Sequence, residues 1–219
     1  MIVIHHLNNS RSQRVLWLLE ELGVPYEIRR YERLPSLAAP PELKAVHPLG
    51  KSPVLTDGDL TLAETGAIVA YIAETYGGGR FQPTPDTADW WRMQHFLHHA
   101  EGSAMPPLFM KLVFARIPSQ APFPIRPVAK ALMRGVDAKL LKPRLAELLD
   151  YWDEALAKTG WFAGLEPTLA DVMMSFPLEA AGSRIGFDGR RNLSAFVERI
   201  HARPAYRAAL EKGGPYAYA

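Results

Sequence analysis

The sequence predicts an α/β domain at the N-terminus followed by an all-helical domain. In the first third, short strand-like and helix-like segments alternate, which is typical of an α/β fold. Residues 77–85 are rich in glycine and proline, and the chain beyond them has helical patterns. We therefore expect two domains, at residues 1–79 and 86–219, a division that a length of 219 residues allows.

The first segments predict a βαβ unit. Residues 2–4 are apolar and β-branched, as in a buried strand. Residues 13–22 place apolar side chains at helical spacing, and Gly23 and Pro25 end that helix. Residues 26–31 follow as a second strand, which a right-handed crossover makes parallel to the first.

A β-hairpin and a helix complete the predicted domain. Two short strand patterns flank the sequence Asp-Gly-Asp at residues 57–59, a strong signal for an antiparallel hairpin. A helix is expected from about residue 66 to residue 76, with Thr65 or Glu64 as its N-cap. The order βαβ, then ββα, is that of a thioredoxin-like fold.

Prolines and capping residues divide the predicted helical domain. We expect a helix from residue 87 that bends or breaks at Pro106 and Pro107, a loop at residues 117–124, a helix from residue 125 that kinks at Pro143, a helix opened by Thr168 and Asp171, and a last main helix capped by Asn192. Thr168 and Asp171 are spaced as a capping box, in which two exposed amides are satisfied reciprocally.

Composition narrows the possible chemistry. The 25 basic and 23 acidic residues are spread along the chain without a run of like charge, so neither nucleic acid nor a membrane surface is an expected partner. The chain has no cysteine, so any sulfur that reacts must arrive with a ligand. The start lacks signal-peptide features and no apolar run approaches ~18 residues, which predicts a cytoplasmic protein.

The turn between the first strand and the first helix holds the candidate catalytic residues Asn9, Ser10 and Ser12. A helix N-terminus favours an anion, and a serine hydroxyl there can donate a hydrogen bond to a ligand's thiolate. Lowering a thiol pKa from ~8.5 by two units needs about 2.7 kcal/mol. A charge-assisted hydrogen bond of ~1.5–3 kcal/mol can supply this. The alternative is that Ser10 or Ser12 only caps the helix.

The segment from His47 to Val54 is a second candidate. A proline directly before a strand is suited to a cis bond, so Pro53 could turn the backbone of Val54 toward a peptide ligand. The run Gly-Lys-Ser at residues 50–52 imitates a phosphate-binding loop. The glycine required five positions earlier is Ala45 and no helix follows, so we reject that interpretation.

Glu64 and Thr65 form a third candidate, at the start of the domain's last helix. Backbone amides there can bind a carboxylate, and Glu64 can pair with an ammonium group, which together suit the α-amino-acid end of a γ-glutamyl peptide. The alternative is an ordinary N-cap with an acid in the first turn.

These motifs resemble a known family. His-Pro-Leu-Gly-Lys-Ser-Pro-Val-Leu at residues 47–55 and Leu-Ala-Glu-Thr-Gly-Ala-Ile at residues 62–68 resemble the glutathione-site signature of the cytosolic glutathione transferases. The resemblance continues into the helical half, where residues 101–107 look like the fungal and bacterial branch. It implies the glutathione transferase architecture, with a thioredoxin-like domain that binds glutathione and a helical domain that holds the second substrate.

The resemblance also implies residue roles. Pro53 would be cis, Val54 would pair with the cysteinyl backbone, Glu64 and Thr65 would bind the γ-glutamyl group, Lys51 or His47 would meet the glycyl carboxylate, Ser52 would belong to the same site, and Ser10 would activate the thiol. Asn9 and Ser12 are rivals of Ser10. The tyrosine-type and cysteine-type classes are excluded, since strand one does not end in tyrosine and the chain has no cysteine.

The implied partners are glutathione as co-substrate, an apolar electrophile and a second copy of the chain, with no metal or other cofactor. In the dimer, Glu101 or Ser103 would approach the partner subunit's glutathione. Met105, Phe109 and Met110 could line the second-substrate pocket, although core packing or the subunit interface would also explain them.

Two other chemistries are set aside. His95, His98 and His99 could gather on one helical face, but they lack an adjacent acid in a zinc-binding arrangement. A serine hydrolase would need a Gly-x-Ser-x-Gly turn to place its nucleophile. We therefore expect an enzyme that uses glutathione thiolate to attack an electrophilic carbon or to reduce an organic peroxide. The alternative is a non-catalytic binding or interaction module of the same fold.

Overall fold

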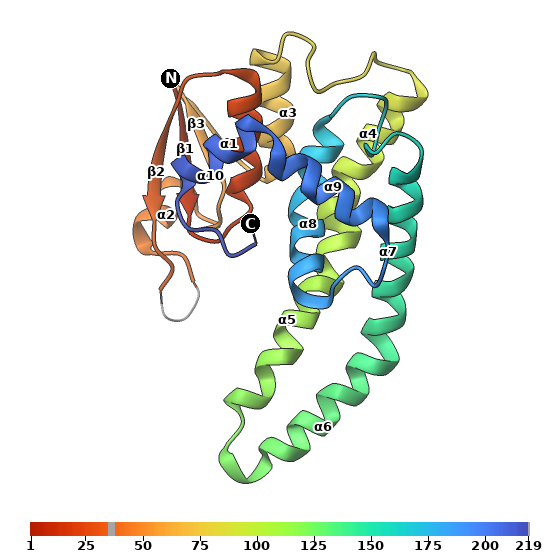
Figure 1. Cartoon of the computed structure of the whole chain (residues 1–219). Coiled ribbons are helices and arrows are strands. Elements are labelled where there is room, and N and C mark those ends of the chain that lie inside the picture. The colour runs from red at the N-terminus through yellow and green to blue at the C-terminus, as the bar shows by residue number, and fades with distance from the viewer. Residues whose placement is uncertain (35–37, 219) are drawn as a thin grey trace.

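The computed structural model describes residues 1–34 and 38–218, and it confirms an α/β domain beside a helical domain (Figure 1). A four-stranded sheet has the order β2-β1-β3-β4. Its strands are β1 (Ile2–Leu7), β2 (Tyr26–Tyr31), β3 (Val54–Asp57) and β4 (Leu60–Ala63). β1 and β2 are parallel, whereas β3 is antiparallel to both of its neighbours. The predicted βαβ unit and hairpin are both confirmed.

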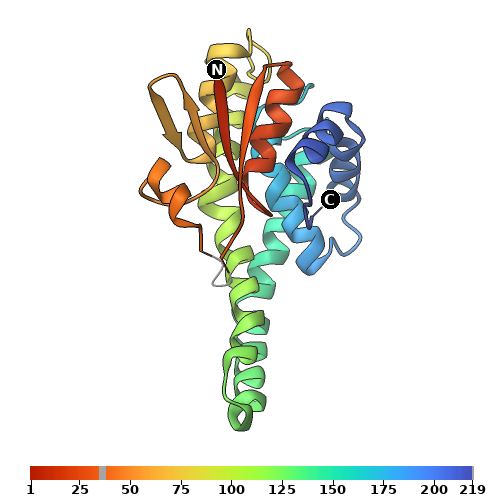
Figure 2. The ribbon, with the colours of Figure 1, turned by 90° about the vertical axis from the view of Figure 1, so that its left-hand side faces the viewer.

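Helix α1 (Ser12–Leu22) is buried along nearly its whole length, because it lies between the sheet and the helical domain (Figure 2). Its apolar residues Val15 to Leu19 are fully buried, and each contributes roughly 1.5–3 kcal/mol to folding. The helix ends at Gly23 in the left-handed conformation, as predicted. The first turn of α1 is polar yet also buried. Ser12 and Arg14 have hydrogen-bond partners inside the protein, whereas the Gln13 side-chain amide has none among the described residues.

Two more helices belong to this domain. Helix α3 (Thr65–Tyr76) follows β4 and matches the predicted helix. Helix α2 (Pro41–Val46) has no counterpart in the sequence analysis, since six residues are too short to show a helical period. It is anchored by Leu43, which is fully buried against Leu7 and Val54.

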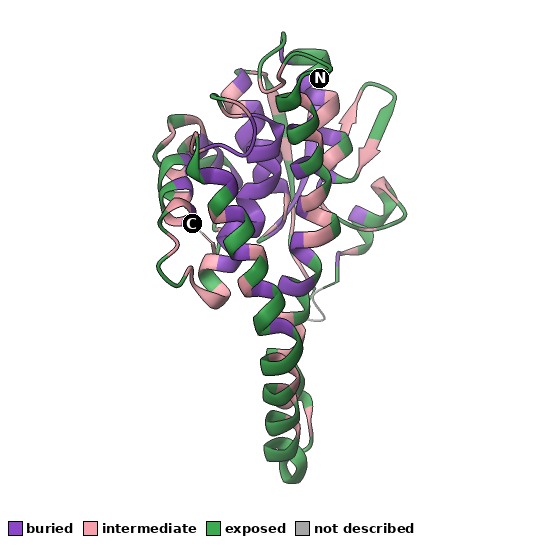
Figure 3. Ribbon diagram, turned by 90° about the vertical axis from the view of Figure 1, so that its right-hand side faces the viewer, coloured by how far each residue is buried: buried purple, intermediate pink, exposed green. Residues whose placement is uncertain are grey.

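The helical domain surrounds one fully buried helix. Its members are α4 (Ala88–His99), α5 (Met105–Gln120), α6 (Arg126–Val136), α7 (Lys142–Ala157), α8 (Leu169–Ile185), α9 (Arg191–Ala202) and α10 (Pro204–Gly213). Helix α8 is buried from Leu169 to Ala181, on all of its faces, which marks it as the centre of the domain (Figure 3). Among the helices that the structure describes, none is long and apolar enough to cross a membrane.

The helix distortions expected at the prolines occur in the turns just N-terminal to them. A π-helical turn at Ala100–Ala104 joins α4 to α5, ahead of Pro106 and Pro107. A second one at Asp137–Leu141 joins α6 to α7, ahead of Pro143. Such turns are a common cause of helix distortion.

The predicted loop at residues 117–124 is wrong in its first half, because α5 continues to Gln120. Pro118 lies in the last turn of α5, where its missing N–H removes only one helical hydrogen bond. The chain then reverses through a 3-10 turn at Phe123–Ile125. As a result α5 and α6 form a long hairpin that projects from the body of the protein (Figures 1 and 2).

The two predicted helix caps have different outcomes. Thr168 and Asp171 form the expected capping box at the start of α8. Asn192 does not cap α9, because it is already the second residue of that helix. Its side chain donates to Asp153 of α7, and Asp153 Oδ1 accepts the backbone N–H groups of Asn192 at 3.0 Å and Leu193 at 3.3 Å. A carboxylate from another helix therefore does the capping.

Candidate functional site

A cavity of about 460 Å³ lies where β1, the loop before β3, the start of α3 and the turn after α4 meet. Its lining includes Lys51, Ser52, Pro53, Glu64 and Thr65, which the sequence analysis singled out. The other lining residues are Leu7, Arg11, Arg33, Ala38, Ala39, Lys44, Leu49, Gly50, Ala63 and Glu101. The two predicted motifs therefore border one common cavity.

The loop before β3 contains the predicted cis bond, between Ser52 and Pro53. The next residue, Val54, is fully buried and pairs with His5 in one strand and Ala63 in the other. Because neighbouring strands flank Val54 on both sides, its backbone is not available to a peptide ligand, and that expectation is wrong. Ser52 precedes the strand and borders the cavity, so it is the better placed neighbour of the proline.

The N-terminus of α3 opens on the same cavity. Glu64 precedes the helix with φ 70° and ψ 118°, a conformation that costs a residue with a side chain roughly 1–3 kcal/mol. In the described part of the chain, the Glu64 side chain makes no capping hydrogen bond. The Ile68 N–H donates to the Glu64 carbonyl at 3.0 Å, so the amides before it belong to the unpaired first turn. Such a helix start can bind a carboxylate.

A buried arginine connects this helix start to the helical domain. The Arg14 side chain is 1% exposed and donates to the Met173 carbonyl at 2.7 Å. It also donates to Thr65 Oγ1 at 3.4 Å and to the carboxylate of Glu101. Arg14 is thereby satisfied on three sides, which a buried guanidinium requires.

Glu101 lies at the edge of the cavity and pairs with two arginines. Besides Arg14, it has Arg11 Nε at 3.0 Å from its other carboxylate oxygen. Burial alone would raise the pKa of Glu101, but Arg14 and Arg11 outweigh burial and hold that pKa below its usual value. Within its own chain Glu101 lines the cavity, and its expected approach to the partner subunit's glutathione stays a prediction.

Ser10 and Ser12 form a hydrogen-bonded chain under the cavity. Ser12 Oγ lies 2.6 Å from Ser10 Oγ and 2.8 Å from His6 Nδ1. Ser10 Oγ lies 3.3 Å from the hydroxyl of Ser52, a lining residue. Ser12 is fully buried and so cannot touch a ligand, whereas Ser10 is 4% exposed and lies next to the cavity wall.

His6 ends this chain as a neutral imidazole at pH 7. Burial, followed by the charge of Arg30, lowers the pKa of His6 to about 4. The ring can then either donate to Ser12 or accept from it, depending on which nitrogen carries the proton. The sequence analysis did not identify His6, because a histidine within a strand has no local signal for this contact.

Asn9 and Arg11 occupy the same turn with different environments. Asn9 has a left-handed φ of 48°, and its Oδ1 accepts the backbone N–H of Ala217 at 2.8 Å. It therefore tethers the C-terminal segment. Arg11 lines the cavity and has 37% of its side chain exposed, so this residue of the turn reaches the site directly. Sequence reasoning missed Arg11, since a single arginine in a polar run forms no pattern.

Two lysines also line the cavity. Lys51 was predicted, whereas Lys44 comes from the unpredicted helix α2. His47 is half-buried, and its Nδ1 accepts the Leu49 N–H at 3.4 Å. Because His47 is outside the cavity lining, Lys44 is better placed than His47 to share an anion with Lys51.

The candidates for the second-substrate pocket separate in the structure. Met105 is 4% exposed and belongs to the core, so it cannot line an open pocket. Phe109 and Met110 are exposed on α5.

The histidines of α4 join an aromatic cluster. His95 Nε2 lies 2.9 Å from the Tyr151 hydroxyl, and His99 Nε2 accepts the Trp152 indole N–H at 2.9 Å.

Comparisons with known proteins agree along the chain. Residues 1–74 match the family model "Glutathione S-transferase, N-terminal domain", and residues 117–204 match "Glutathione S-transferase, C-terminal domain". Glutathione S-transferase 3 of Schizosaccharomyces pombe is 37% identical over 97% of this chain and 88% of its own length. Glutathione S-transferase 1 of Saccharomyces cerevisiae is 31% identical over 97% of this chain and 95% of its own.

Solved structures show the same likeness. A glutathione S-transferase from Actinobacillus pleuropneumoniae has a TM-score of 0.82 at 32% identity, covering 100% of this chain and 95% of that one. A glutathione transferase homologue from Lodderomyces elongisporus, solved with two glutathione molecules per subunit, has a TM-score of 0.77 at 17% identity over 96% and 97% of the two chains. At that identity the second likeness concerns the fold alone.

Proposed function

Because this chain belongs to the glutathione S-transferase family, we propose that the cavity of about 460 Å³ is its glutathione site and that the first turn of α1 holds the bound sulfur as a thiolate. The chain is a glutathione transferase. One observation carries the residue assignment: the cis-proline loop, the open start of α3 and a cationic rim border one cavity.

The charges of the cavity complement those of glutathione. The tripeptide carries two carboxylates, one ammonium group and a thiol that ionises. The cavity has four cationic side chains and two acidic ones, which are Arg11, Arg33, Lys44, Lys51, Glu64 and Glu101. An excess of positive charge around an anionic ligand speeds its association and fixes its orientation.

The positions of these charges orient the ligand. The γ-glutamyl carboxylate binds the first-turn amides of α3 beside Thr65, and the ammonium group pairs with Glu64. The glycyl carboxylate lies between Lys44 and Lys51. Ser52 takes the cysteinyl backbone contact first expected of Val54, because Val54 is enclosed by two strands.

Ser10 is the proposed donor to the thiolate. When Nδ1 of His6 carries the ring proton, His6 donates to Ser12 and Ser12 donates to Ser10. Ser52 Oγ donates to the His5 carbonyl at 2.9 Å and can therefore only accept from Ser10, so the Ser10 hydrogen turns from Ser52 to the sulfur when glutathione binds. The α1 terminus and the guanidinium of Arg11 add positive potential at the same place. These donors need to supply about 2.7 kcal/mol to lower the thiol pKa by two units.

The thiolate then attacks an electrophilic carbon, a sulfur–carbon bond forms, and the leaving group departs with its electron pair. The chain contributes orientation and stabilisation of the anion. Calorimetric titration with glutathione tests the site, and we expect one molecule bound per chain. The proposal fails if the protein takes up no glutathione.

With glutathione bound, activity assays on a panel of halonitroarenes, isothiocyanates, epoxides and hydroperoxides identify the second substrate.

We propose that the chain forms a homodimer through the projecting hairpin. Val128 and Leu132 of α6 lie on one face with Ile125 of the preceding turn, at helical spacing, and the three are between 54% and 69% exposed. An exposed apolar face of this kind on one helix is typical of an interface. Sedimentation at micromolar concentration should give twice the mass of the chain, and a monomer would contradict the proposal.

Two coarser assignments accompany this function. We propose a domain division at residues 1–79 and 86–219, and cleavage by limited proteolysis within residues 80–85 would support it.

A cytoplasmic location suits the proposed reaction, because the cytosol keeps its glutathione pool reduced. Cell fractionation tests this, and recovery outside the cytosol would contradict it.

A further inference from the structure

The serine–histidine series (Ser10, Ser12 and His6) connects two cavities. At one end, Ser10 Oγ lies 3.3 Å from the hydroxyl of Ser52, which lines the glutathione cavity. At the other end, His6 lines a smaller cavity of about 170 Å³ between β2 and the end of α10. The two cavities have no lining residue in common. The series is therefore a hydrogen-bonded connection between two separate openings.

The smaller cavity is polar and reaches the surface. Arg30, Glu32 and Asn9 line it and are exposed, so it is open to solvent. The other lining residues are His6, Asn8, Tyr31, Gly213, Gly214 and Pro215. A polar cavity of this size has room for several water molecules with protein partners. A proton that leaves His6 on this side can thus reach bulk solvent through water.

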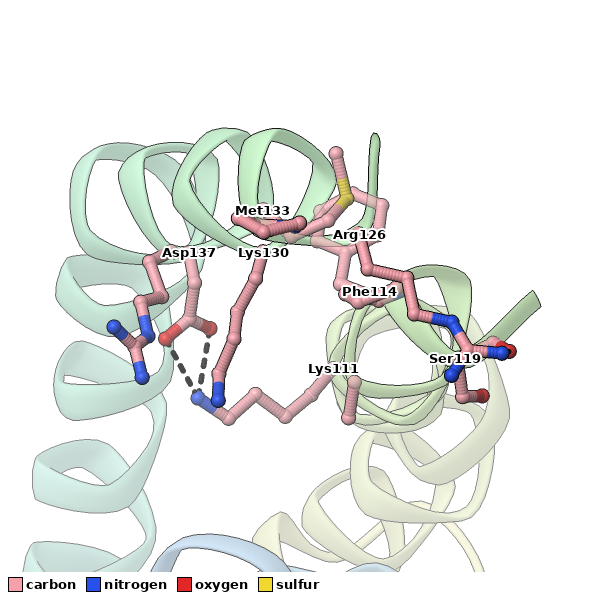
Figure 4. A pocket seen from close by; sticks show the side chains of 11 residues that line it. Lys111, Phe114, Ser119, Arg126, Lys130, Met133 and Asp137 are labelled. Carbon is pink, nitrogen blue, oxygen red and sulfur yellow. Dashed lines mark hydrogen bonds and ion pairs between the residues drawn. The ribbon is translucent and has the colours of Figure 1, made fainter. Parts of the chain in front are cut away.

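The larger cavity between α5 and α6 offers the series no outlet. It has a volume of about 710 Å³ and lies in the projecting hairpin, where Lys111 Nζ donates to both carboxylate oxygens of Asp137 at 2.7 Å (Figure 4). None of the residues that line it belongs to the series or to the smaller cavity. The smaller cavity is therefore the opening that matters for His6.

The hydrogen bonds around Ser10 leave one path for a proton. Ser52 Oγ donates to the His5 carbonyl at 2.9 Å and accepts the Leu7 N–H at 3.0 Å, so the Ser52 hydrogen is committed. The Ser12 N–H points at Ser10 Oγ from 3.3 Å and only donates. Among the described residues, the Ser12 hydroxyl is thus the neighbour of Ser10 that links it onward to a titratable group.

His6 can pass a proton across its ring, because its two nitrogens face different partners. Nδ1 lies 2.8 Å from Ser12 Oγ, and a hydrogen bond to the Gly213 backbone, at the smaller cavity, favours a proton on the ring. Burial and then the charge of Arg30 outweigh that hydrogen bond and lower the pKa of His6 to about 4. At pH 7 the ring therefore does not keep two protons, and a proton received at Nδ1 is matched by one that leaves Nε2.

We propose that Ser10, Ser12 and His6 carry the proton of the glutathione thiol from the glutathione cavity to the smaller cavity, an inference that rests on the proposed function. The S–H bond breaks as Ser10 Oγ takes the hydrogen. The hydrogen of Ser10 passes to Ser12, that of Ser12 passes to Nδ1 of His6, and the Nε2 hydrogen passes to water in the smaller cavity. The sulfur keeps the electron pair as a thiolate.

These transfers end in the arrangement that stabilises the thiolate. Afterwards Nδ1 carries the ring proton, so His6 donates to Ser12, Ser12 donates to Ser10 and Ser10 donates to the sulfur. Once the product has left, the same transfers run in the reverse direction with water in place of the sulfur, and the starting tautomer of His6 is restored. Ser12 and His6 thus act through Ser10 and do not touch the substrate.

Temperature-jump relaxation of the saturated glutathione complex tests the proposal. The ultraviolet absorbance of the thiolate then reports how fast the bound thiol and thiolate interconvert. In His6→Asn, the amide can still donate to Ser12 but cannot pass a proton to the smaller cavity. We expect relaxation about tenfold slower or more, because a positioned proton carrier contributes roughly 10²–10⁴-fold and water in the glutathione cavity replaces part of it. The fraction of thiolate at equilibrium and the Kd for glutathione should stay close to those of the parent.

The matched control is His5→Asn. His5 is the neighbouring residue of β1, points to the opposite face of the sheet and has its Nδ1 2.8 Å from the Tyr31 hydroxyl. This variant should relax like the parent. Ser12→Ala interrupts the series in its middle and should also slow the relaxation. The double variant of His6→Asn and Ser12→Ala should be no slower than the slower single variant, since both remove links of one path.

Three results would overturn the proposal. One is a parent-like relaxation rate in His6→Asn. Another is equal slowing in the His5→Asn control, which would indicate a general disturbance of the strand. The third is additive slowing in the double variant, which would place Ser12 and His6 on separate paths. A parent complex without thiolate would instead overturn the proposed function, so the two failures are distinguishable.

Discussion

Ser12 Oγ lies 2.8 Å from His6 Nδ1, and Ser12 is fully enclosed at this contact. The pair joins the first strand to the first helix, next to the cavity that we propose binds glutathione. Because the Ser12 hydroxyl also lies 2.6 Å from Ser10 Oγ, the state of one imidazole is linked to the hydroxyl proposed to meet the sulfur.

His6 makes stability depend on pH. Its pKa in the folded protein is about 4, below its ordinary value of 6.5, because burial disfavours the charged ring. Between pH 4 and pH 6.5 the unfolded chain therefore binds more protons than the folded one. The contribution of neutral His6 to the free energy of unfolding is complete above pH 6.5 and is lost as the pH drops toward 4. The slope from one such group is about 1.4 kcal/mol per pH unit.

The variant His6→Asn should flatten that slope, because asparagine keeps a hydrogen-bonding group beside Ser12 and does not titrate. Denaturant unfolding at several pH values between 4 and 7 measures the difference between the variant and the parent. Asp171, whose pKa burial raises to about 6, acts in the opposite direction below pH 6, but it is present in both proteins and cancels. Parallel pH profiles for the two proteins would contradict the prediction.

Glu101 compensates the buried charge of Arg14, so Glu101→Gln should destabilise the protein. We expect a loss of about 2 kcal/mol, below the 3–5 typical of a fully buried pair, since the Glu101 side chain is 34% exposed. Combining it with Arg14→Met in a double-mutant cycle measures the coupling. The control Asp150→Asn breaks an ion pair whose acid is 69% exposed, and should cost less than about 1 kcal/mol. If Glu101→Gln and Asp150→Asn lowered the free energy of unfolding equally, the role assigned to Glu101 would be refuted.

Lys44 and Lys51 should each contribute to glutathione affinity. Lys44→Ala or Lys51→Ala should raise the Kd for glutathione by roughly three- to tenfold, because each removes a charge near the glycyl carboxylate. Lys139→Ala, outside the cavity, serves as the control. For a glutathione derivative amidated at the glycyl carboxylate, the lysine variants should bind like the parent. A loss of affinity that persists with the amidated ligand would argue against this placement.

Asp171 holds the segment before α8 in place. It accepts the Phe162 N–H at 2.8 Å, the Thr168 N–H at 2.7 Å and the Thr168 hydroxyl at 3.0 Å. Asp171→Ala leaves buried amides unpaired and should cost about 3 kcal/mol or more in the free energy of unfolding. Asp171→Asn keeps one acceptor and should cost less. If thermal or denaturant unfolding ranked the two variants in the reverse order, the capping role would be wrong.

Local patterns were sufficient where the interaction itself is local. The hairpin around residues 57–59 and the end of α1 at Gly23 depend on backbone conformations that neighbouring residues favour. The capping box of Thr168 and Asp171 spans three positions. These features could be predicted because no distant segment is needed to satisfy them.

Predictions failed where a distant segment changes the outcome. Asn192 looked like a cap, but Asp153 of another helix satisfies the amides of α9. Val54 looked available to a ligand until the register of β3 enclosed it between two strands. Arg11 and Lys44 reach the cavity only through the packing of α1 and α2 around it, which single residues in a sequence do not reveal.

The ionisation of bound glutathione is the most direct test of the central claim. Ultraviolet thiolate absorbance of the glutathione complex, measured as a function of pH, gives the pKa of the bound thiol in the parent, Ser10→Ala and Ser12→Ala. We expect a bound thiol roughly two pKa units below the free value of ~8.5 in the parent, most of that shift lost in Ser10→Ala, and a smaller loss in Ser12→Ala. An unchanged thiol pKa in Ser10→Ala would contradict the account and direct attention to Asn9 or Arg11.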